Sequence, residues 1–215
     1  MHYTSVLFDL DGTLLDTLGD LTAAMNRTLT RHGLPERTRQ QMRTALGNGA
    51  RRLMELSVPS GTDSALFETL LAEYNADYAA HCRIETAPYP GVAALLRTLH
   101  TQGRKLAIVS NKPDEAVRAL RADFFADAVQ IAVGETAAIR RKPVADMLLH
   151  AMEQLGADPD KTVFVGDSEV DIATARAADL PCISVLWGFR DRDVLERAGA
   201  QQFAADIAQL QALLG

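Results

Sequence analysis

The chain has 215 residues, of which 47 % are hydrophobic and 23 % are charged. This length and composition are typical of one globular domain with a smaller insertion, and they exclude a fibre, a peptide or a large multidomain assembly. The 22 basic and 28 acidic side chains leave a formal net charge of −6. Because such a surface does not attract phosphate backbones, we expect no nucleic-acid partner.

Cysteine usage and the N-terminal sequence indicate the compartment. Cys82 and Cys182 form neither a Cys-x-x-Cys pair nor a zinc-like cluster with histidine, which favours a reducing environment. The N-terminal residues lack a basic segment with an apolar signal core, and no apolar run approaches the roughly 18 residues of a membrane span. We therefore expect a cytoplasmic monomer or homodimer without a membrane partner.

Short apolar runs alternate with amphipathic segments over most of the chain. The runs that predict buried strands are 6–8, 106–109, 129–133, 162–165 and 182–185. The segments that predict helices between them are 92–102, 114–121, 144–154 and 171–178, the third opened by Pro143. Buried strands joined by helical crossovers predict an α/β fold with a doubly wound, Rossmann-like parallel sheet.

Residues 16–82 contain no convincing strand and interrupt this alternation. Apolar residues recur at helical spacing from Leu18 to Leu29, and Thr17 with Asp20 predicts a capping box at the helix start. Further helices are expected at 38–45, 50–56 and 64–80. We therefore expect an all-helical cap domain at 16–82, inserted into an α/β core made of residues 1–15 and 83–215.

Polar residues follow the first predicted strand, at the edge where α/β sheets bind ligands. Asp9 and Asp11 are two residues apart, so on an extended chain their carboxylates point the same way. Adjacent carboxylates repel each other unless a cation or a shared proton lies between them. The following Gly12 and Thr13 are also compatible with an ordinary Asp-Gly turn.

Three further polar motifs follow in the chain. Ser110-Asn111 ends the second predicted strand, Lys142 precedes a proline, and the fourth strand runs into Gly-Asp-Ser-Glu-Val-Asp with Asp167 and Asp171. A hydroxyl can bind a phosphoryl oxygen, and carboxylates are hard ligands that suit Mg²⁺. Taken singly, these motifs also fit a helix cap, a solvated lysine and an acidic helix start.

In this order, and at these strand ends, the motifs resemble those of the haloacid dehalogenase-like hydrolase superfamily. The chain is most similar to the phosphoglycolate phosphatase-like branch, which carries a helical cap after the first strand, and the resemblance covers nearly the whole chain. It implies a Mg²⁺-dependent phosphatase that hydrolyses a small organic phosphate monoester through an aspartyl-phosphate.

The resemblance also implies roles for individual residues. Asp9 would be the nucleophile and Asp11 the general acid and base. Ser110 would hold a phosphoryl oxygen, and Lys142 would neutralise charge on the transferring group. The metal ligands implied are Asp9, Asp11, Asp167 and Asp171, the last directly or through water. The substrate-binding residues expected are Gly12, Thr13, Asn111, Arg51 and Arg52.

Two segments have more than one interpretation, and one residue departs from the shared pattern. Two glycines precede Arg51 and Arg52, which makes this cap loop a candidate anion site, although both arginines could equally be solvated. Trp187-Gly188-Phe189 could contact substrate or pack against the rim of the sheet. Asp179 stands where a helix-ending glycine is usual.

Proteins with other functions use some of the same catalytic and metal-binding residue types. A phosphomutase would return the phosphoryl group of the same intermediate to a sugar phosphate, and an inorganic pyrophosphatase would hydrolyse a phosphoanhydride. Dehalogenation ranks lower because halide departure needs no acid such as Asp11. A phosphoacceptor signalling module also combines acidic residues, a hydroxyl, a lysine and Mg²⁺, but the long helical insertion and Asp11 argue against it.

Overall fold

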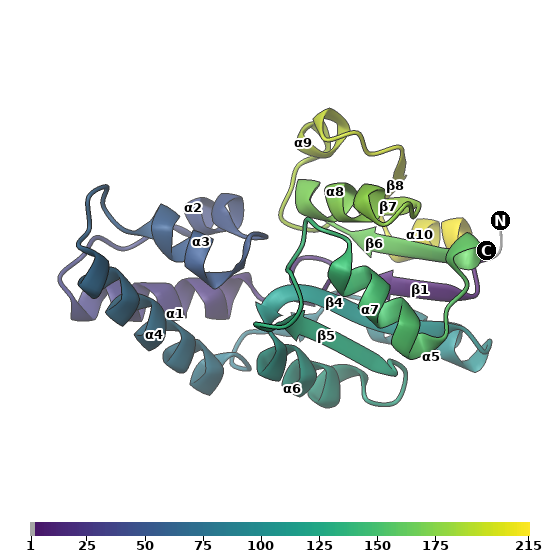
Figure 1. Ribbon diagram of the computed structural model, residues 1–215, viewed down its shortest axis with the longest axis horizontal. Helices are drawn as coiled ribbons and strands as arrows, with labels where there is room; N and C mark the ends of the chain where they lie inside the picture. The colour runs from purple at the N-terminus through teal and green to yellow at the C-terminus, as the bar shows by residue number, and fades with distance from the viewer. Residues whose placement is uncertain (1–2) are drawn as a thin grey trace. The chain divides into compact units, whose positions relative to one another are not determined.

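The computed structural model describes residues 3–215, and the chain divides into two compact units (Figure 1). One unit contains the chain up to Leu15 together with Pro88–Gly215, and the other is Asp16–Ala87. Short strands β2 (Leu15–Asp16) and β3 (Ala87–Pro88) pair where the chain leaves the first unit and where it returns. Within residues 3–215, no helix combines the length and apolar character needed to cross a bilayer.

The first unit is built on a six-stranded parallel sheet. Its strands are β1 (Ser5–Phe8), β4 (Lys105–Pro113), β5 (Ile131–Glu135), β6 (Thr162–Gly166), β7 (Cys182–Val185) and β8 (Gln202–Ala204). Their spatial order is β5-β4-β1-β6-β7-β8. The chain adds strands on one side of β1 and then returns to add strands on its other side. Such a reversal of strand order creates a ligand-binding crevice at the carboxyl ends of the central strands.

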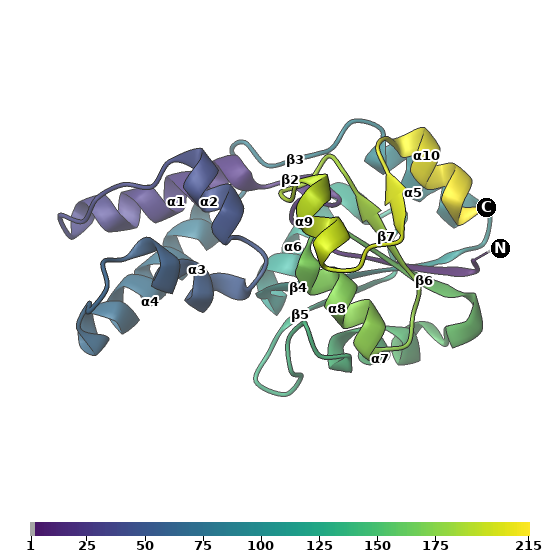
Figure 2. The same cartoon turned by 90° about the horizontal axis from the view of Figure 1, so that it is seen from above.

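Helices cover both faces of this sheet, and the predicted α/β fold is confirmed (Figure 2). Helices α7 (Asp146–Leu155) and α8 (Glu169–Ala177) pack on one face, and α5 (Val92–Thr101), α6 (Asp114–Phe125) and α10 (Ile207–Leu214) pack on the other. Helix α9 (Arg192–Arg197) packs against α8, and a 3₁₀ turn, η1 (Pro159–Lys161), precedes β6. Every residue of β1 is buried, as expected for a strand covered on both faces.

Several element boundaries differ from those predicted. Strand β8 was not predicted because it has three residues, of which only Ala204 is buried. Helix α7 begins at Asp146, so the prediction that Pro143 opens this helix is wrong. The side chain of Asn111 accepts a hydrogen bond from the Lys142 N–H and donates one to the Lys142 carbonyl. The Lys142 backbone is thus tied to β4 through Asn111, and the helix begins only after this contact.

The second unit consists of four helices: α1 (Leu18–Arg31), α2 (Arg39–Ala45), α3 (Gly49–Ser57) and α4 (Ser64–His81). Helix α1 packs against α4 and α2, and α3 packs against the same two helices. The predicted apolar stripe of α1 is buried from Leu18 to Leu29. Asp77 of α4 is also buried, where it forms ion pairs with Arg27 and Arg31 of α1 at 2.6 Å and 2.9 Å. A buried carboxylate needs such partners, so this cluster joins the two longest helices of the unit.

The capping box predicted for the start of α1 is wrong. Thr17 makes no side-chain cap hydrogen bond. The Asp20 carboxylate, 3 % exposed, instead accepts hydrogen bonds from the backbone N–H groups of Ile84, Glu85 and Thr86 at 2.9–3.1 Å. Three N–H donors offset the cost of burying the charge. Asp20 therefore fixes the returning segment of this unit against the start of α1.

Replacing Asp20 with alanine should strongly destabilise the protein. We expect a loss of about 3 kcal/mol in the free energy of unfolding, because three backbone N–H groups lose their acceptor. Urea unfolding followed by circular dichroism measures this loss. Asp20→Asn keeps one acceptor oxygen and should lose less. A change below about 0.5 kcal/mol in Asp20→Ala would contradict the role given to this carboxylate.

Asp179 occupies the glycine position of a helix C-terminal motif. Its φ is 56°, and the N–H groups of Asp179 and Leu180 donate to the carbonyls of Arg176 and Ala175 after α8 ends. This pattern is the Schellman motif, in which a left-handed residue is usually glycine. Because aspartate adopts this conformation at a cost, exposed Asp179 is a site of mild strain.

Asp179→Gly should stabilise the protein. We expect a gain of about 0.5–1 kcal/mol in the free energy of unfolding, because glycine adopts a positive φ without steric cost. The midpoint of urea unfolding reports the gain. Asp179→Ala, which lacks both the freedom of glycine and the local hydrogen bonding of aspartate, should move the midpoint in the opposite direction. An equal shift in both variants would rule out backbone strain as the cause.

Candidate active site

Three buried carboxylates meet at the carboxyl ends of the central strands. Asp9 follows β1, Asp167 follows β6, and Asp171 lies in the first turn of α8. One oxygen from each lies within 4.8 Å of the others, and the three residues are 7 %, 2 % and 0 % exposed. The parallel topology explains this convergence, because β1 and β6 are neighbours whose carboxyl ends share one edge.

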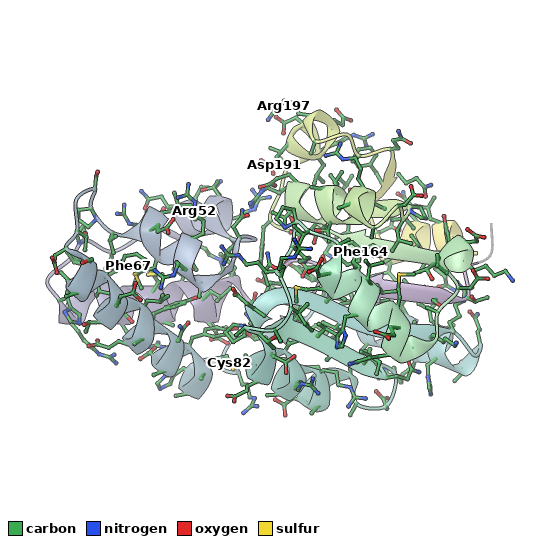
Figure 3. The ribbon with its side chains drawn as sticks, viewed as in Figure 1. Arg52, Phe67, Cys82, Phe164, Asp191 and Arg197 are labelled. Carbon is green, nitrogen blue, oxygen red and sulfur yellow. The ribbon has the colours of Figure 1, made fainter. Side chains whose placement is uncertain are left out.

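Lys142 is the cation at the centre of this cluster. Its Nζ lies 2.8 Å from Asp9 Oδ1 and 2.7 Å from Asp171 Oδ1. The ammonium also lies 5.4 Å from the centroid of the Phe164 ring, which belongs to β6 (Figure 3). Two reciprocal hydrogen bonds from the Asn111 side chain, at 2.9 Å and 3.0 Å, hold the Lys142 backbone. Asn111, expected to bind substrate, thus positions the lysine in this structure.

The electrostatics of the cluster show an excess of negative charge. Burial raises the pKa of Asp9 well above its usual value, and the Asp171 carboxylate raises it further against the opposing effect of Lys142. Burial and Asp171 likewise raise the pKa of Asp167 to about 7. Burial alone would lower the pKa of Lys142, but the charges of Asp171 and Asp9 outweigh that effect and raise it. Lys142 therefore stays protonated, and it does not by itself neutralise three carboxylates.

This donor set fits a hard divalent cation. Carboxylate oxygens are the ligands that Mg²⁺ prefers, and a second cation would favour the ionised form of Asp9 and Asp167, against the burial and the Asp171 charge that raise their pKa values. Both oxygens of Asp171 already accept hydrogen bonds. Its Oδ1 accepts from Lys142, and its Oδ2 accepts from the Ser168 N–H and hydroxyl at 3.1 Å and 2.6 Å. Asp171 therefore orients the lysine and the loop after β6.

Asp11 and Ser110 lie beside the cluster. Asp11 Oδ1 is 2.9 Å from the ammonium of Lys112, a lysine of β4 that sequence reasoning did not assign to the site. Ser110 is 2 % exposed, and its Oγ accepts a hydrogen bond from the Lys112 N–H at 3.3 Å. A hydroxyl that accepts one bond retains its own proton for donation to a ligand oxygen.

The turn after Asp11 packs tightly against Asp167. Gly12 has a φ of 85°, and a Cβ at this position would lie 2.3 Å from Asp167 Oδ2, so only glycine fits. The N–H groups of Gly12 and Thr13 donate within the turn, to Leu15 and Leu10. The Thr13 hydroxyl donates to Asp167 Oδ1 at 3.4 Å. Substrate binding by Gly12 and Thr13 stays a prediction.

The loop after β7 supports the same carboxylate. The Phe189 N–H donates to Asp167 Oδ2 at 2.6 Å, and Trp187 Nε1 donates to the Thr13 carbonyl at 3.1 Å. Phe189 is buried and Trp187 half-buried, so this aromatic turn packs against the rim of the sheet. The aromatic residues of this turn could be singled out from the sequence. The hydrogen bond to Asp167 could not be predicted, because it comes from a backbone N–H that every residue except proline has.

Arg51 and Arg52 lie in the helical unit, on α3, and both are exposed. Arg52 is labelled in Figure 3. Arg51 forms two hydrogen bonds of 2.8 Å to Glu68 of α4, and this bidentate contact lowers the pKa of Glu68. Arg52 pairs with Glu55 on its own helix at 2.9 Å. In this structure both arginines have a carboxylate partner, so a substrate anion would compete with Glu68 and Glu55 for them.

Comparisons with known proteins agree with these features. The sequence model of the family of haloacid dehalogenase-like hydrolases matches residues 6–185 of the chain. A phosphoglycolate phosphatase of Pseudomonas putida is 34 % identical over 97 % of this chain and 78 % of its own. An N-acetylmuramic acid 6-phosphate phosphatase of Pseudomonas aeruginosa is 33 % identical over 88 % of this chain and 84 % of its own.

A solved structure extends the similarity to the whole fold. The crystal structure of a protein from Lactobacillus delbrueckii subsp. bulgaricus, provisionally described as a phosphoglycolate phosphatase, has a TM-score of 0.94 and 34 % identity, and the match covers 100 % of this chain and 99 % of that one. The chain therefore belongs to the haloacid dehalogenase-like hydrolases, in their phosphoglycolate phosphatase-like branch of phosphoric monoester hydrolases.

Proposed function

We propose that the chain is a Mg²⁺-dependent phosphatase that hydrolyses a small anionic phosphate monoester, of the phosphoglycolate type, through an aspartyl-phosphate on Asp9. The observation that carries this proposal is the buried Asp9 carboxylate, 2.8 Å from the Lys142 ammonium and grouped with Asp167 and Asp171. The named relatives supply the substrate class, since both act on phosphate esters of small organic acids.

The proposed metal ligands are the carboxylates of Asp9 and Asp167 and the backbone carbonyl of Asp11, with Asp171 acting through water. When bound, Mg²⁺ supplies positive charge that offsets the repulsion between the phosphoryl group and the carboxylate nucleophile. The structure supports this assignment through the chemistry of the donor set and the raised pKa values of Asp9 and Asp167.

The residues of the chain perform two displacements at phosphorus. In the first, an Asp9 oxygen attacks phosphorus, the bond to the ester oxygen breaks, and Asp11 gives its proton to that oxygen. In the second, Asp11 accepts a proton from water, the water oxygen attacks phosphorus, and Asp9 is regenerated with release of phosphate. The Ser110 hydroxyl and the Lys142 ammonium donate to the phosphoryl oxygens throughout.

The helical unit, proposed as a cap, would select the substrate. A cap that excludes water while the leaving group is present favours transfer to Asp9 and prevents side reactions. Arg51 and Arg52 are its candidate anion contacts, in competition with Glu68 and Glu55. The expected partner is thus a small phosphate ester, while the monomeric or homodimeric state and the cytoplasmic location stay predictions.

A substrate panel tests the proposal. The panel contains phosphoglycolate, N-acetylmuramic acid 6-phosphate, sugar phosphates, nucleotides and pyrophosphate, and kcat/KM is measured with Mg²⁺ and with a chelator. We expect Mg²⁺-dependent release of phosphate, with the highest kcat/KM for a small carboxylated ester. Isomerised sugar phosphate without free phosphate would favour a mutase, selective turnover of pyrophosphate would favour a pyrophosphatase, and no turnover of any ester would reject the proposal.

A further inference from the structure

Lys112 is a buried lysine that the two displacements described above do not use. It lies near the end of β4, and its side chain is 4 % exposed. Its ammonium is 2.9 Å from Oδ1 of Asp11, whose side chain is 20 % exposed. Lysine is almost never buried to this extent without a partner, because desolvation of an ammonium is costly. The contact with Asp11 is therefore a built feature of the site.

The two lysines of the site contact different carboxylates. Lys142 contacts Asp9 and Asp171, whereas Lys112 contacts Asp11. Charge neutralisation at the nucleophile thus falls to Lys142. The ammonium of Lys112 instead lies beside the carboxyl group of the residue proposed to transfer the proton.

The backbone around Lys112 fixes its position relative to Asp11. Strands β1 and β4 are parallel neighbours with Phe8 opposite Ile108, so the turn after β1 runs beside the last residues of β4. The pairing of β4 with β5 is irregular between Val109 and Pro113, and residues 110–112 are all buried. The Lys112 N–H is also bound by the Ser110 hydroxyl. Asp11, by contrast, lies on the turn after β1 and is partly exposed, and the contact with the Lys112 ammonium is one that can fix its carboxyl group.

We propose that Lys112 is a positioning residue that holds the Asp11 carboxyl group for proton transfer to the leaving oxygen, an inference that rests on the proposed phosphatase function. The Lys112 ammonium lies 2.9 Å from Oδ1, so Oδ2 is the oxygen that we assign to carry the proton. As the bond between phosphorus and the ester oxygen breaks, that proton moves to the ester oxygen and a negative charge develops on Asp11 beside the ammonium. A misplacement of about 1 Å at such a group can cost about 100-fold in rate.

Phosphate esters with different leaving groups test whether Lys112 acts through proton transfer from Asp11. An alkyl phosphate needs a proton on its departing oxygen, whereas 2,4-dinitrophenyl phosphate releases a stable phenolate. The quantity compared is kcat/KM with Mg²⁺, because it includes transfer to Asp9 but not the later hydrolysis of the intermediate. The variants are Lys112→Met and Lys112→Arg, with Lys161→Met, an exposed lysine of η1, as the matched control.

For Lys112→Met we expect kcat/KM to fall by about 100-fold or more with the best alkyl ester of the panel, and by less than about 5-fold with the dinitrophenyl ester. Lys112→Arg should recover most of the alkyl activity, and Lys161→Met should match the wild type. Activity of Lys112→Met on the dinitrophenyl ester also shows that the variant is folded.

Two results would overturn the role of Lys112 while leaving the proposed function intact. Equal losses of kcat/KM for both esters would mean that Lys112 acts on the phosphoryl group or is needed for folding, and not that it positions Asp11. A rise in KM for the alkyl ester at unchanged kcat would make Lys112 a substrate contact. If the wild type hydrolysed neither ester, the phosphatase proposal itself would fail, and the positioning role would fail with it.

Discussion

The Asp9→Asn variant is expected to lose at least about 1,000-fold in the Mg²⁺-dependent hydrolysis of any ester that the wild type accepts, because an amide is too weak a nucleophile to form the covalent intermediate. Lys142, Asp167 and Ser110 remain in place around the substituted side chain, so binding should suffer less than turnover. Steady-state phosphate release measures the loss. Acid-quenched enzyme from a radiolabelled ester should also carry the phosphoryl group in the wild type and not in the variant.

The matched control is Asp160→Asn, an exposed aspartate of η1, which should retain wild-type activity. Asp9→Asn should also fold, because the pKa of Asp9 is raised by burial and the neutral amide removes a charge that the fold holds at a cost. Turnover within about 10-fold of the wild type, in a folded variant, would remove Asp9 from the role of nucleophile.

The fold could be predicted because its strands carry strong local signals. The runs around Phe8, Ile108 and Phe164 are buried on both faces of the sheet, so they consist of consecutive apolar residues that hydrophobic patterning detects. Strand order then brings polar residues that lie far apart in the chain, such as Asp9 and Asp167, to one edge. This topology explains how Asp9 and Asp167 meet, whereas Lys142 could be grouped with them only through the resemblance to a known family.

The contacts that orient these groups could not be predicted in the same way. Ser110, Asn111 and Lys112 are consecutive and all buried, because β4 is irregular there and the usual alternation of strand faces fails. The partner of Asp20 is a backbone segment more than sixty positions away. Backbone N–H groups carry no signature in the sequence, so the local interpretation of Asp20 as a capping residue was the only one available.

The Asp167→Asn variant is expected to lose Mg²⁺ binding and, without metal, to be more stable than the wild type at alkaline pH. Burial and the Asp171 carboxylate raise the pKa of Asp167 from 3.8 to about 7 in the folded protein. A group with a raised folded pKa contributes stability below its unfolded value, and that contribution is lost as the pH rises towards the folded value. Between about pH 4 and pH 7, the wild type therefore loses stability that the neutral asparagine retains.

Thermal unfolding in a chelator at pH 4, 6 and 8 tests this expectation. The difference in Tm between Asp167→Asn and the wild type should grow from pH 4 to pH 7, reach about 2 °C or more, and stay constant above that. Adding Mg²⁺ at pH 8 should reverse the order, because only the wild type binds the ion through this carboxylate and is stabilised by it. A difference that stays constant over the whole pH range would show that Asp167 is ionised without penalty. In that case its burial beside Asp171 would no longer be an argument for a metal at this position.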